Sequence, residues 1–539
     1  MSFYRAHILV CNGTPCILKG SRAVQTALVD EIKKKGLENE IKVVETGCLG
    51  ISEVGPVMVV YPEGVTYCKV TVEDVPTIVE EHLLKGRVVQ RLVYTEKTQP
   101  VVTSAESARH KEQRVVLKNV GVIDPTSIEE YIAVGGYEAL GKALTEMTPV
   151  DVVKAVKDSG LKGRGGAAFP TGLKWELTAN APGTDKAIVC NADEGEPGNF
   201  KDRLILEGDP HSIVEAMIIA GYAIGANKGY IYIRGEYQQS VDHLERAIAT
   251  AREFELLGED ILGSKFNFDI QVFKGAGAYI CGEETALLES LEGTRGESRM
   301  KPPYPPTSGL HSKPTVINNV ETLANIPHII ANGAHWFASI GTEQSKRTKI
   351  FSPCGDVLYP GVYEVPFGTT MREVIYEMAG GIKSGKDLKA VLIGGPSGIC
   401  VSKADLDRQF AFEDLPPGAG ALIVMDETKC MVDIMQNCSQ FFLHESCGQC
   451  VPCREVTKRL HEMFTWWMSG AGGPADINQA KELGDMMAVT AKCGLGQFAA
   501  TAFRTSLPLF EKEYRAHVVD KVCPAGVCKM DNGHESEDV

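Results

Sequence analysis

Three cysteines at C-x2-C-x2-C spacing, Cys447, Cys450 and Cys453, constrain this chain more than any other feature of its sequence. Such a run places three thiolates around one small volume, as a cubane iron–sulfur cluster requires. A distant residue can supply the fourth ligand, and Cys493 lies at a predicted helix end directly before a glycine. The alternative is structural zinc, but zinc sites usually use paired C-x2-C units. The run therefore predicts a [4Fe–4S] cluster.

The wider composition fits a metal-binding protein of a reducing compartment. The chain has 539 residues, 16 cysteines and a net charge of −15. Closely spaced thiols in such a compartment are more often metal ligands or redox centres than disulfides. The acidic balance argues against binding to nucleic acid or to a basic membrane surface. We find neither a signal peptide nor an apolar run of about 18 residues, and we expect a cytoplasmic protein without a membrane span.

Periodicity and polar breaks divide the chain into six segments, and its length suits several domains. The expected segments are a small α/β unit at 1–95, a linker at 96–115, a layered α/β domain with a mostly parallel sheet at 116–335, a small α+β module at 336–425, a bundle of four helices at 426–515 and a tail at 516–539. The fold class is therefore multidomain α/β.

A second group of cysteines lies near the N-terminus. Cys11 and Cys16 form C-x4-C, and Cys48 follows a predicted strand. These three resemble three corners of a [2Fe–2S] site, but position 52, where the fourth cysteine is expected, holds Ser52. Two interpretations stay open: a [2Fe–2S] cluster with an altered ligand, or a small domain whose cysteines hold no cluster.

Glycine-rich and acidic loops indicate a nucleotide site in the segment 116–335. Gly163, Arg164 and Gly165 belong to a flexible cationic loop that can approach a phosphate or a flat ring, although a helix precedes it where a dinucleotide fingerprint needs a strand. A polar loop past the carboxyl end of a strand is the second candidate, because open α/β sheets bind ligands there. Its polar residues are Asn191, Asp193, Glu194 and Glu196.

Two glutamates, Glu283 and Glu284, open a predicted helix after the loop that begins at Gly275. Carboxylates are comfortable at a helix N-terminus, which is an adequate structural explanation for them. They would repel a phosphate, so the loop suits a ribose or a nicotinamide amide better.

The tail carries a further C-x4-C pair, Cys523 and Cys528, flanked by His517 and His534. One interpretation is a zinc site completed by Cys438, and the other is a set of free thiols in a mobile end.

Six motifs in order resemble the flavin-containing NADH-binding subunit of respiratory complex I and its soluble relatives, the diaphorase subunits of NAD-linked hydrogenases and formate dehydrogenases. They are GLKGRGGAAFPTGLKW, CNADEGEPGNFKDR, GAGAYICGEETALLESLEG, KPPYPP, INNVETLANI and ESCGQCVPCRE, within residues 116–515. The resemblance implies a Rossmann-like FMN- and NADH-binding domain, a ubiquitin-like β-grasp module of the SLBB type and a four-helix bundle holding [4Fe–4S].

Residues 1–95 resemble the thioredoxin-like [2Fe–2S] domain fused in front of this module in the beta subunits of multimeric, often electron-bifurcating, hydrogenases. The fusion distinguishes the chain from the flavin subunit of ordinary complex I.

The resemblance also implies roles for individual residues. The FMN site would comprise Gly163, Arg164, Gly165, Lys174, Asn191, Asp193, Glu194, Glu283, Asn318, Asn319 and Thr322. NAD(H) would meet Phe169, Glu196, Tyr279, Glu284, Lys301 and Tyr304, with Glu196 and Glu284 in the catalytic roles. Because both carboxylates disfavour a 2′-phosphate, we expect NADH rather than NADPH.

We therefore predict the FMN iron–sulfur subunit of a hetero-oligomeric oxidoreductase that passes electrons between NAD(H), FMN and iron–sulfur clusters. The implied partners are a small thioredoxin-like [2Fe–2S] subunit and a catalytic subunit, most often a hydrogenase. The alternatives are the diaphorase subunit of a formate dehydrogenase or another low-potential reductase, and a non-catalytic scaffold subunit.

Overall fold

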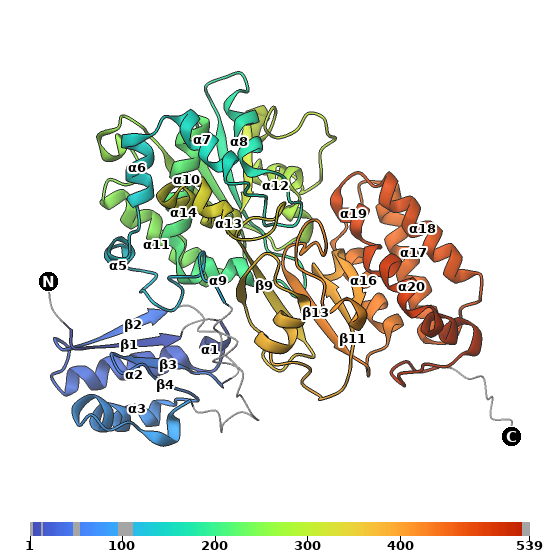
Figure 1. Ribbon diagram of the computed structural model, residues 1–539, viewed down its shortest axis with the longest axis horizontal. Helices are drawn as coiled ribbons and strands as arrows, with labels where there is room; N and C mark the ends of the chain where they lie inside the picture. The colour runs from blue at the N-terminus through green and yellow to red at the C-terminus, as the bar shows by residue number, and fades with distance from the viewer. Residues whose placement is uncertain (1–3, 12–13, 47–53, 95–111, 531–539) are drawn as a thin grey trace.

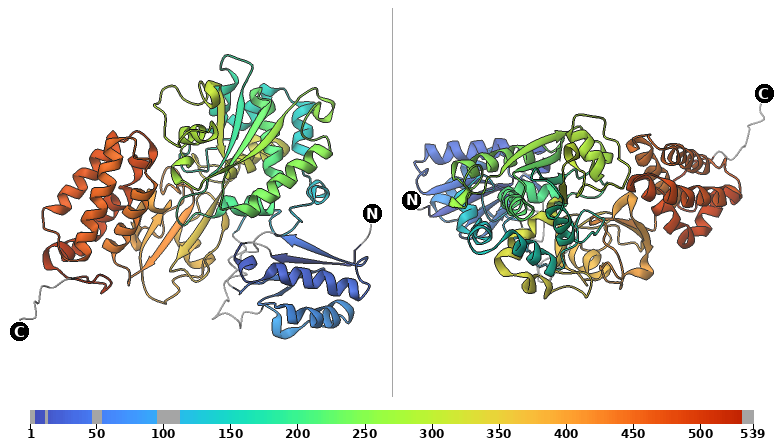
Figure 2. Two further views of the ribbon diagram at one scale, coloured as in Figure 1. Left: turned by 180° about the vertical axis from the view of Figure 1, so that it is seen from behind. Right: turned by 90° about the horizontal axis from the view of Figure 1, so that it is seen from above.

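The computed structural model describes residues 4–11, 14–46, 54–94 and 112–530. In Figure 1 the N-terminal unit lies beside the large α/β domain, and the C-terminal helices lie at the opposite end of the molecule, with a sheet between them. Both further views keep this order (Figure 2). Most of the expected linker, as well as Cys48, Ser52 and His534, lies outside the described residues.

The N-terminal unit is a four-stranded sheet in the order β2-β1-β3-β4. Strand β1 pairs in parallel with β2 and antiparallel with β3. Helix α2 buries Val24, Leu28 and Ile32, a spacing that gives one apolar face. Lys42 forms an ion pair with Glu130 of the next domain at 2.7 Å. The elements are β1 (Ala6–Cys11), α1 (Thr14–Leu18), α2 (Ser21–Lys34), β2 (Ile41–Thr46), β3 (Met58–Tyr61), β4 (Val65–Tyr67), η2 (Val72–Asp74), α3 (Val75–Thr77), η3 (Ile78–Leu84) and η4 (Gln90–Leu92).

The large α/β domain is built on a parallel sheet in the order β7-β6-β5-β8, which confirms the predicted parallel arrangement. Helix α10 is mostly apolar and is buried along almost its whole length, as expected for a helix in the middle of a domain. The elements are α5 (Ile128–Ala133), α6 (Glu138–Glu146), α7 (Pro149–Asp158), α8 (Thr171–Ala179), β5 (Ala187–Ala192), α9 (Lys201–Gly208), α10 (Pro210–Ile224), β6 (Lys228–Arg234), α11 (Gln238–Glu253), η6 (Ile261–Gly263), β7 (Asp269–Gly275), η7 (Tyr279–Gly282), α12 (Glu284–Leu291), η8 (Leu310–Ser312), β8 (Thr315–Asn319), α13 (Val320–Ala324), α14 (Ile326–Asn332) and α15 (Ala334–Ala338).

A five-stranded sheet in the order β10-β9-β13-β11-β12 follows. Strands β9 and β13 are parallel neighbours, and the other pairings are antiparallel. This sheet lies in the segment 336–425, for which the sequence predicts a small α+β module. The elements are β9 (Thr348–Gly355), β10 (Tyr363–Pro366), η9 (Glu373–Met378), β11 (Leu388–Ile393), η10 (Gly395–Ser397), β12 (Ile399–Ser402), η11 (Lys403–Asp405) and β13 (Ala421–Asp426).

The C-terminal region is helical, and the four predicted helices are confirmed. A short fifth helix, α19, begins directly after Cys493, where two glycines hid it from sequence analysis. None of the helices within the described ranges has both the length and the apolar character that a membrane crossing needs. The elements are α16 (Met431–Glu445), α17 (Val451–Met468), α18 (Asp476–Thr490), α19 (Gly494–Phe498), α20 (Thr501–Arg515) and η12 (Ala516–Asp520).

Candidate functional site

A cavity of about 590 Å³ lies where the α/β domain, the five-stranded sheet and the helical region meet. The loop after β5 forms one wall, as expected for a ligand site at the carboxyl edge of a parallel sheet. Of the predicted residues, Gly165, Asn191, Asp193, Glu194, Glu196, Tyr279, Glu283 and Asn319 line this cavity. The other predicted residues of the nucleotide site lie behind it or beside it.

The glycine loop lets backbone approach the cavity closely. A Cβ atom on Gly165 would stand 3.0 Å from the Cβ of Asn319, and Gly166 has φ +117°, in the region that favours glycine. The Arg164 side chain, in contrast, turns away from the cavity and is buried. Its guanidinium donates to the carbonyl oxygens of Lys162 and Lys346 at 3.1 and 2.7 Å. The backbone N–H of Arg164 remains in the glycine loop and donates to the Thr322 hydroxyl at 2.8 Å, and its place in the FMN site stays a prediction.

Asp193 is a buried carboxylate that faces the cavity without a hydrogen-bond donor. Its side chain is 2% exposed, and neither oxygen accepts a hydrogen bond from the described residues. Arg234 is its nearest cation, at 3.6 Å. Burial raises the pKa of Asp193 to about 7, although the Arg234 charge opposes the shift. An orphaned buried acceptor of this kind fits a ligand that brings hydroxyl or amide donors.

Glu194 and Lys201 form the floor of the cavity. The Glu194 carboxylate accepts from the backbone N–H groups of Lys201, Asp202 and Arg203 at the start of α9. Lys201 is buried, and its ammonium pairs with Asp202 at 2.6 Å and with Glu321 at 3.0 Å. Sequence analysis missed Lys201, although it follows the acidic loop directly in a motif that carried the family resemblance.

Glu196 is held by groups from two domains. The Tyr279 hydroxyl donates to one of its oxygens at 2.5 Å, and the backbone N–H and hydroxyl of Ser397 donate at 2.9 and 2.8 Å. Burial raises the pKa of Glu196 above its usual value, while these donors oppose the shift. Ser397 was also missed, because its GGPSG turn reads as an ordinary connection between strands.

The remaining predicted residues form a charged layer beside the cavity. Lys301 pairs with Glu283 at 2.7 Å and with Glu284 at 2.9 Å, and Lys174 reaches Glu284 at 3.3 Å. The Glu283 side chain caps α12 by accepting from the N–H groups of its first turn. Phe169 and Tyr304 are exposed, 43% and 55% respectively, so their rings are available for stacking. The other three predicted residues do not line the cavity but make hydrogen bonds that support the glycine loop and strand β8. They are Gly163, Asn318 and Thr322.

The four predicted cluster cysteines surround one small cavity. Cys450 and Cys493 are the N-cap residues of α17 and α19. Gly448 has φ +74° in the turn that brings Cys447 and Cys450 together. Burial and the neighbouring thiols raise the pKa of Cys453 to about 11, so the group needs a cationic centre to ionise. The donor set fits a [4Fe–4S] cluster.

Ile280 and Leu495 line both cavities. The cavity of the four thiols and the larger cavity are therefore direct neighbours.

The N-terminal unit shows two of its three predicted ligands. Cys11 ends β1 and Cys16 lies in α1, both buried beside Cys68. The third ligand, Cys48, and Ser52 fall outside the described residues.

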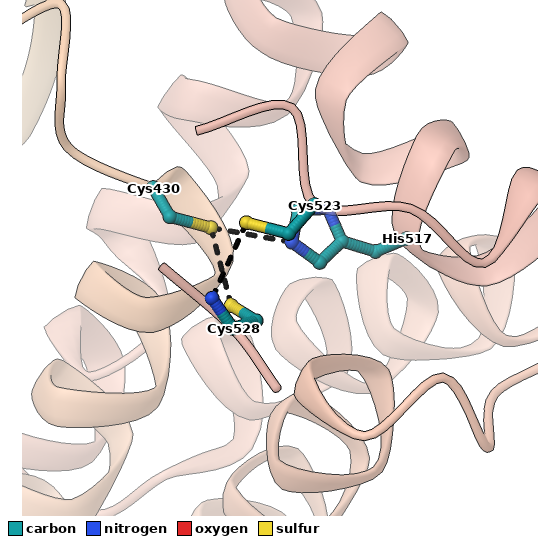
Figure 3. A group of neighbouring side chains, drawn as sticks. All are labelled: Cys430, His517, Cys523 and Cys528. Atoms are coloured by element: carbon teal, nitrogen blue, oxygen red, sulfur yellow. Dashed lines mark hydrogen bonds between the residues drawn. The ribbon is translucent and has the colours of Figure 1, made fainter. Parts of the chain in front are cut away.

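The tail cysteines form a third group that contains the predicted His517 but not the predicted Cys438. Cys523, Cys528 and His517 gather around Cys430 rather than Cys438 (Figure 3). Cys438 lies two turns further along α16 in the core of the helical region, so the prediction that it joins the tail group is wrong.

Three family models match successive parts of the chain. They are the thioredoxin-like [2Fe–2S] ferredoxin over residues 3–83, the Nuo51 FMN-binding domain over 156–328 and the iron-sulfur binding region of NADH-ubiquinone oxidoreductase-F over 433–517. The FMN-binding model contains the loops that line the cavity, and the iron–sulfur model contains all four cluster cysteines. Residues 518–539 lie outside these models.

Several whole proteins are similar as well. The NADP-reducing hydrogenase subunit HndC of Solidesulfovibrio fructosivorans is 51% identical over 79% of this chain and 87% of its own length. The matching subunit of the NADH-quinone oxidoreductase of Escherichia coli is 42% identical over 73% and 90%. The alpha subunit of the NAD-reducing hydrogenase HoxS of Cupriavidus necator is 37% identical over 95% and 83%.

A solved structure agrees with these relatives. The crystal structure of an NAD⁺-reducing [NiFe]-hydrogenase in the H2-reduced state has a chain that matches with a TM-score of 0.68 and 30% identity, over 96% of this chain and 84% of that one. Domain order, cavity, cysteine set and relatives lead to one conclusion. The chain belongs to the family of FMN-binding, iron–sulfur NADH dehydrogenase and diaphorase subunits that share the Nuo51 FMN-binding domain.

Proposed function

We propose that this chain is the NAD(H)-oxidising or NAD-reducing FMN subunit of a cytoplasmic, multisubunit hydrogenase. The observation that carries the proposal is the wall shared by the two cavities, Ile280 and Leu495, because it brings a nucleotide site next to four cysteines of a cluster type. When bound, FMN takes a hydride as an electron pair and releases electrons singly. The hydrogenase relatives, 51% and 30% identical, support hydrogenase as the partner enzyme.

The residues of the cavity divide into two working groups in this proposal. Asn191, Asp193, Glu194 and Asn319 would hold FMN, together with the glycine loop, because all of these line the same cavity. Glu196 and Tyr279 orient the nicotinamide nucleotide, since their hydrogen bond joins the acidic loop to the loop after β7. Phe169, Glu284, Lys301 and Tyr304 would contact the rest of NAD(H) at the open side.

We also propose NADH as the preferred nucleotide, because Glu196 and Glu284 would repel a 2′-phosphate. The relative HndC is named as NADP-reducing, so the choice is a real alternative within the family. Comparison of KM for NADH and NADPH decides it. A lower KM for NADPH would reverse this assignment.

The domain assignment belongs to the same proposal. The sheet has the order β10-β9-β13-β11-β12, and the last strand of this module, β13, pairs in parallel with its first strand, β9. This arrangement supports a ubiquitin-like β-grasp module at 336–425. The helices support a four-helix bundle with [4Fe–4S] at 426–515. The unit at 1–95 would be the thioredoxin-like [2Fe–2S] domain, with Cys11, Cys16 and Cys48 as ligands. The unit at 116–335 would be the Rossmann-like nucleotide domain. A small [2Fe–2S] subunit and the hydrogenase subunit would complete the complex.

The test is NADH oxidation with a viologen acceptor by the purified chain carrying FMN and iron, with Glu196→Ala measured beside the wild type. Removal of this carboxylate leaves the buried Tyr279 hydroxyl without its acceptor, so kcat/KM should fall at least about tenfold. The scaffold alternative predicts no NADH-dependent turnover in either protein. Unchanged turnover in Glu196→Ala would contradict the role of this residue.

A further inference from the structure

We propose that two consecutive residues, Glu445 and Ser446, link the nucleotide cavity to the cluster. Glu445 is a positioning residue for Tyr279, and the Ser446 hydroxyl donates a hydrogen bond to the sulfur of a cluster cysteine. Glu445 ends α16, and Ser446 follows it directly before Cys447. The role of Glu445 rests on the proposed function, whereas the role of Ser446 rests on the cysteine set alone.

Glu445 stands where the physics of an isolated helix disfavours a carboxylate. The negative end of the helix dipole lies at the C-terminus, where cations rather than anions are stabilised. Glu445 is nevertheless the last residue of α16. A contact outside the helix, rather than the stability of the helix itself, accounts for a carboxylate in this place.

That contact is with η7, the short helical turn over Tyr279–Gly282. Oε2 of Glu445 accepts a hydrogen bond from the backbone N–H of Tyr279 at 2.9 Å. Ala278, which precedes η7, has no side-chain oxygen that could satisfy this N–H. Glu445 thus supplies from the helical region the acceptor that the loop after β7 lacks in its own sequence.

The Tyr279 side chain is held by the same end of α16. Its ring lies against Phe441, one turn before Glu445, with the ring centroids 4.9 Å apart. Its hydroxyl donates at 2.5 Å to Glu196, which we propose orients the nicotinamide nucleotide. Because α16 fixes both the backbone and the ring of Tyr279, the position of Glu196 depends on this helix end as well.

Ser446 serves the cluster side. Its hydroxyl oxygen lies 3.2 Å from the Cys453 sulfur. The backbone N–H of Gly448 donates to the same oxygen at 3.2 Å, so the hydroxyl proton can point at the sulfur. A sulfur that ligates iron is a thiolate and can only accept, which makes Ser446 the donor. Hydrogen bonds to cluster sulfurs are among the factors that set the reduction potential.

The two contacts leave from adjacent positions of one backbone. Ile280, the neighbour of Tyr279, lines both cavities, so the segments on either side of the shared wall are hydrogen-bonded to each other as well as packed. Such a connection would hold the nucleotide site and the cluster at a fixed separation, in the way that a supporting shell fixes the groups of a functional site.

The role of Glu445 is tested with Glu445→Met, which keeps the volume but has no oxygen acceptor, and with Glu445→Gln, which keeps one. We expect KM for NADH to rise about tenfold in Glu445→Met with a smaller change in kcat, because Tyr279 loses its fixed position. In Glu445→Gln, KM should return to within about twofold of the wild type. The matched control is Glu482→Met, at an exposed position of α18.

The role of Ser446 is tested by EPR redox titration of the cluster with dithionite, in the full-length protein loaded with FMN and iron. A donor to the sulfur offsets part of its negative charge and so favours the reduced cluster. The midpoint potential should therefore be more negative in Ser446→Ala and should return to the wild-type value in Ser446→Thr, which keeps the hydroxyl. KM for NADH should stay within about twofold of the wild type in both variants.

The two roles can fail separately. Equal KM values in Glu445→Met and Glu445→Gln, with a wild type that NADH reduces, would overturn the role of Glu445. A potential in Ser446→Ala equal to that of the wild type would overturn the role of Ser446. A wild type that NADH does not reduce contradicts the proposed function and the role of Glu445 with it, while the dithionite titration still decides the role of Ser446.

Discussion

The helical region contains two groups of metal-type ligands whose surroundings differ. Cys447, Cys450 and Cys493 are only partly buried and share a wall with the nucleotide cavity. In the tail group, Cys430, His517 and Cys528 are buried, and the second nitrogen of the imidazole is held by a backbone carbonyl. The first group therefore lies next to the proposed nucleotide site, whereas the second is mostly buried and lines neither of the two cavities.

The largest effect that would sharpen this comparison is expected from Cys450→Ser. Loss of one thiolate from the open group should remove the [4Fe–4S] signal and nearly all its iron, because the cluster needs all four ligands. FMN binding should stay near the wild-type value. Iron analysis and EPR check this outcome, with Cys438→Ser as the control. Retention of the full [4Fe–4S] signal would contradict the ligand assignment.

Gly165→Val tests the cavity side of the comparison. The added side chain would press on Asn319, since even a Cβ would stand 3.0 Å from its Cβ atom. We expect Kd for FMN, measured by fluorescence quenching, to rise at least about tenfold, in line with the cost of overpacking. Gly141→Ala in the same domain is the control, because nothing lies within 4 Å of its added Cβ. Equal FMN affinity in both variants would place the flavin elsewhere.

Asp193, in the larger cavity, should make the stability of the protein depend on pH. Burial raises its pKa to about 7, so the native state binds this proton more tightly than the unfolded chain does. Its contribution to stability is therefore full below about pH 4 and is lost as the pH rises through 7. We compare the unfolding free energy of Asp193→Asn with that of the wild-type apoprotein at two pH values. The difference, variant minus wild type, should be about 1–3 kcal/mol larger at pH 8 than at pH 4.5. Urea titrations at both pH values measure this, and a constant difference would contradict it.

The smallest effect is expected on the outer surface of α17, between the two ligand groups. Trp466 is 39% exposed, and the Arg459 guanidinium lies 4.5 Å from the centre of its ring. Trp466→Ala should cost no more than about 1 kcal/mol and leave the iron content unchanged. Loss of iron in this variant would show that the cluster depends on the helix surface as well as on its own ligands.

Local patterns were enough to predict much of this structure. The apolar periodicities located the four helices of the helical region. The layered α/β pattern of the segment 116–335 predicted its parallel sheet. The C-x2-C-x2-C run, with Cys493, identified the four residues that the fold brings together. These signals succeeded because each depends on residues that are close in sequence or on a spacing that the chemistry demands.

The misses have tertiary causes. Cys430 stands in a segment without any local motif, and only the packing of η12 and the tail brings His517 and Cys528 to it. Ser397 reaches Glu196 from a different domain. No single-sequence pattern records which of two nearby thiols, Cys430 or Cys438, will face the tail.

The most direct test of the electron-transfer account is an anaerobic titration of the purified, FMN- and iron-loaded protein with NADH, followed by flavin absorbance and cluster EPR. The account predicts that NADH bleaches the flavin and that a reduced [4Fe–4S] signal appears in the same titration. This signal should be absent from Cys450→Ser, although its flavin still bleaches. A flavin that stays oxidised in the presence of excess NADH would contradict the central claim.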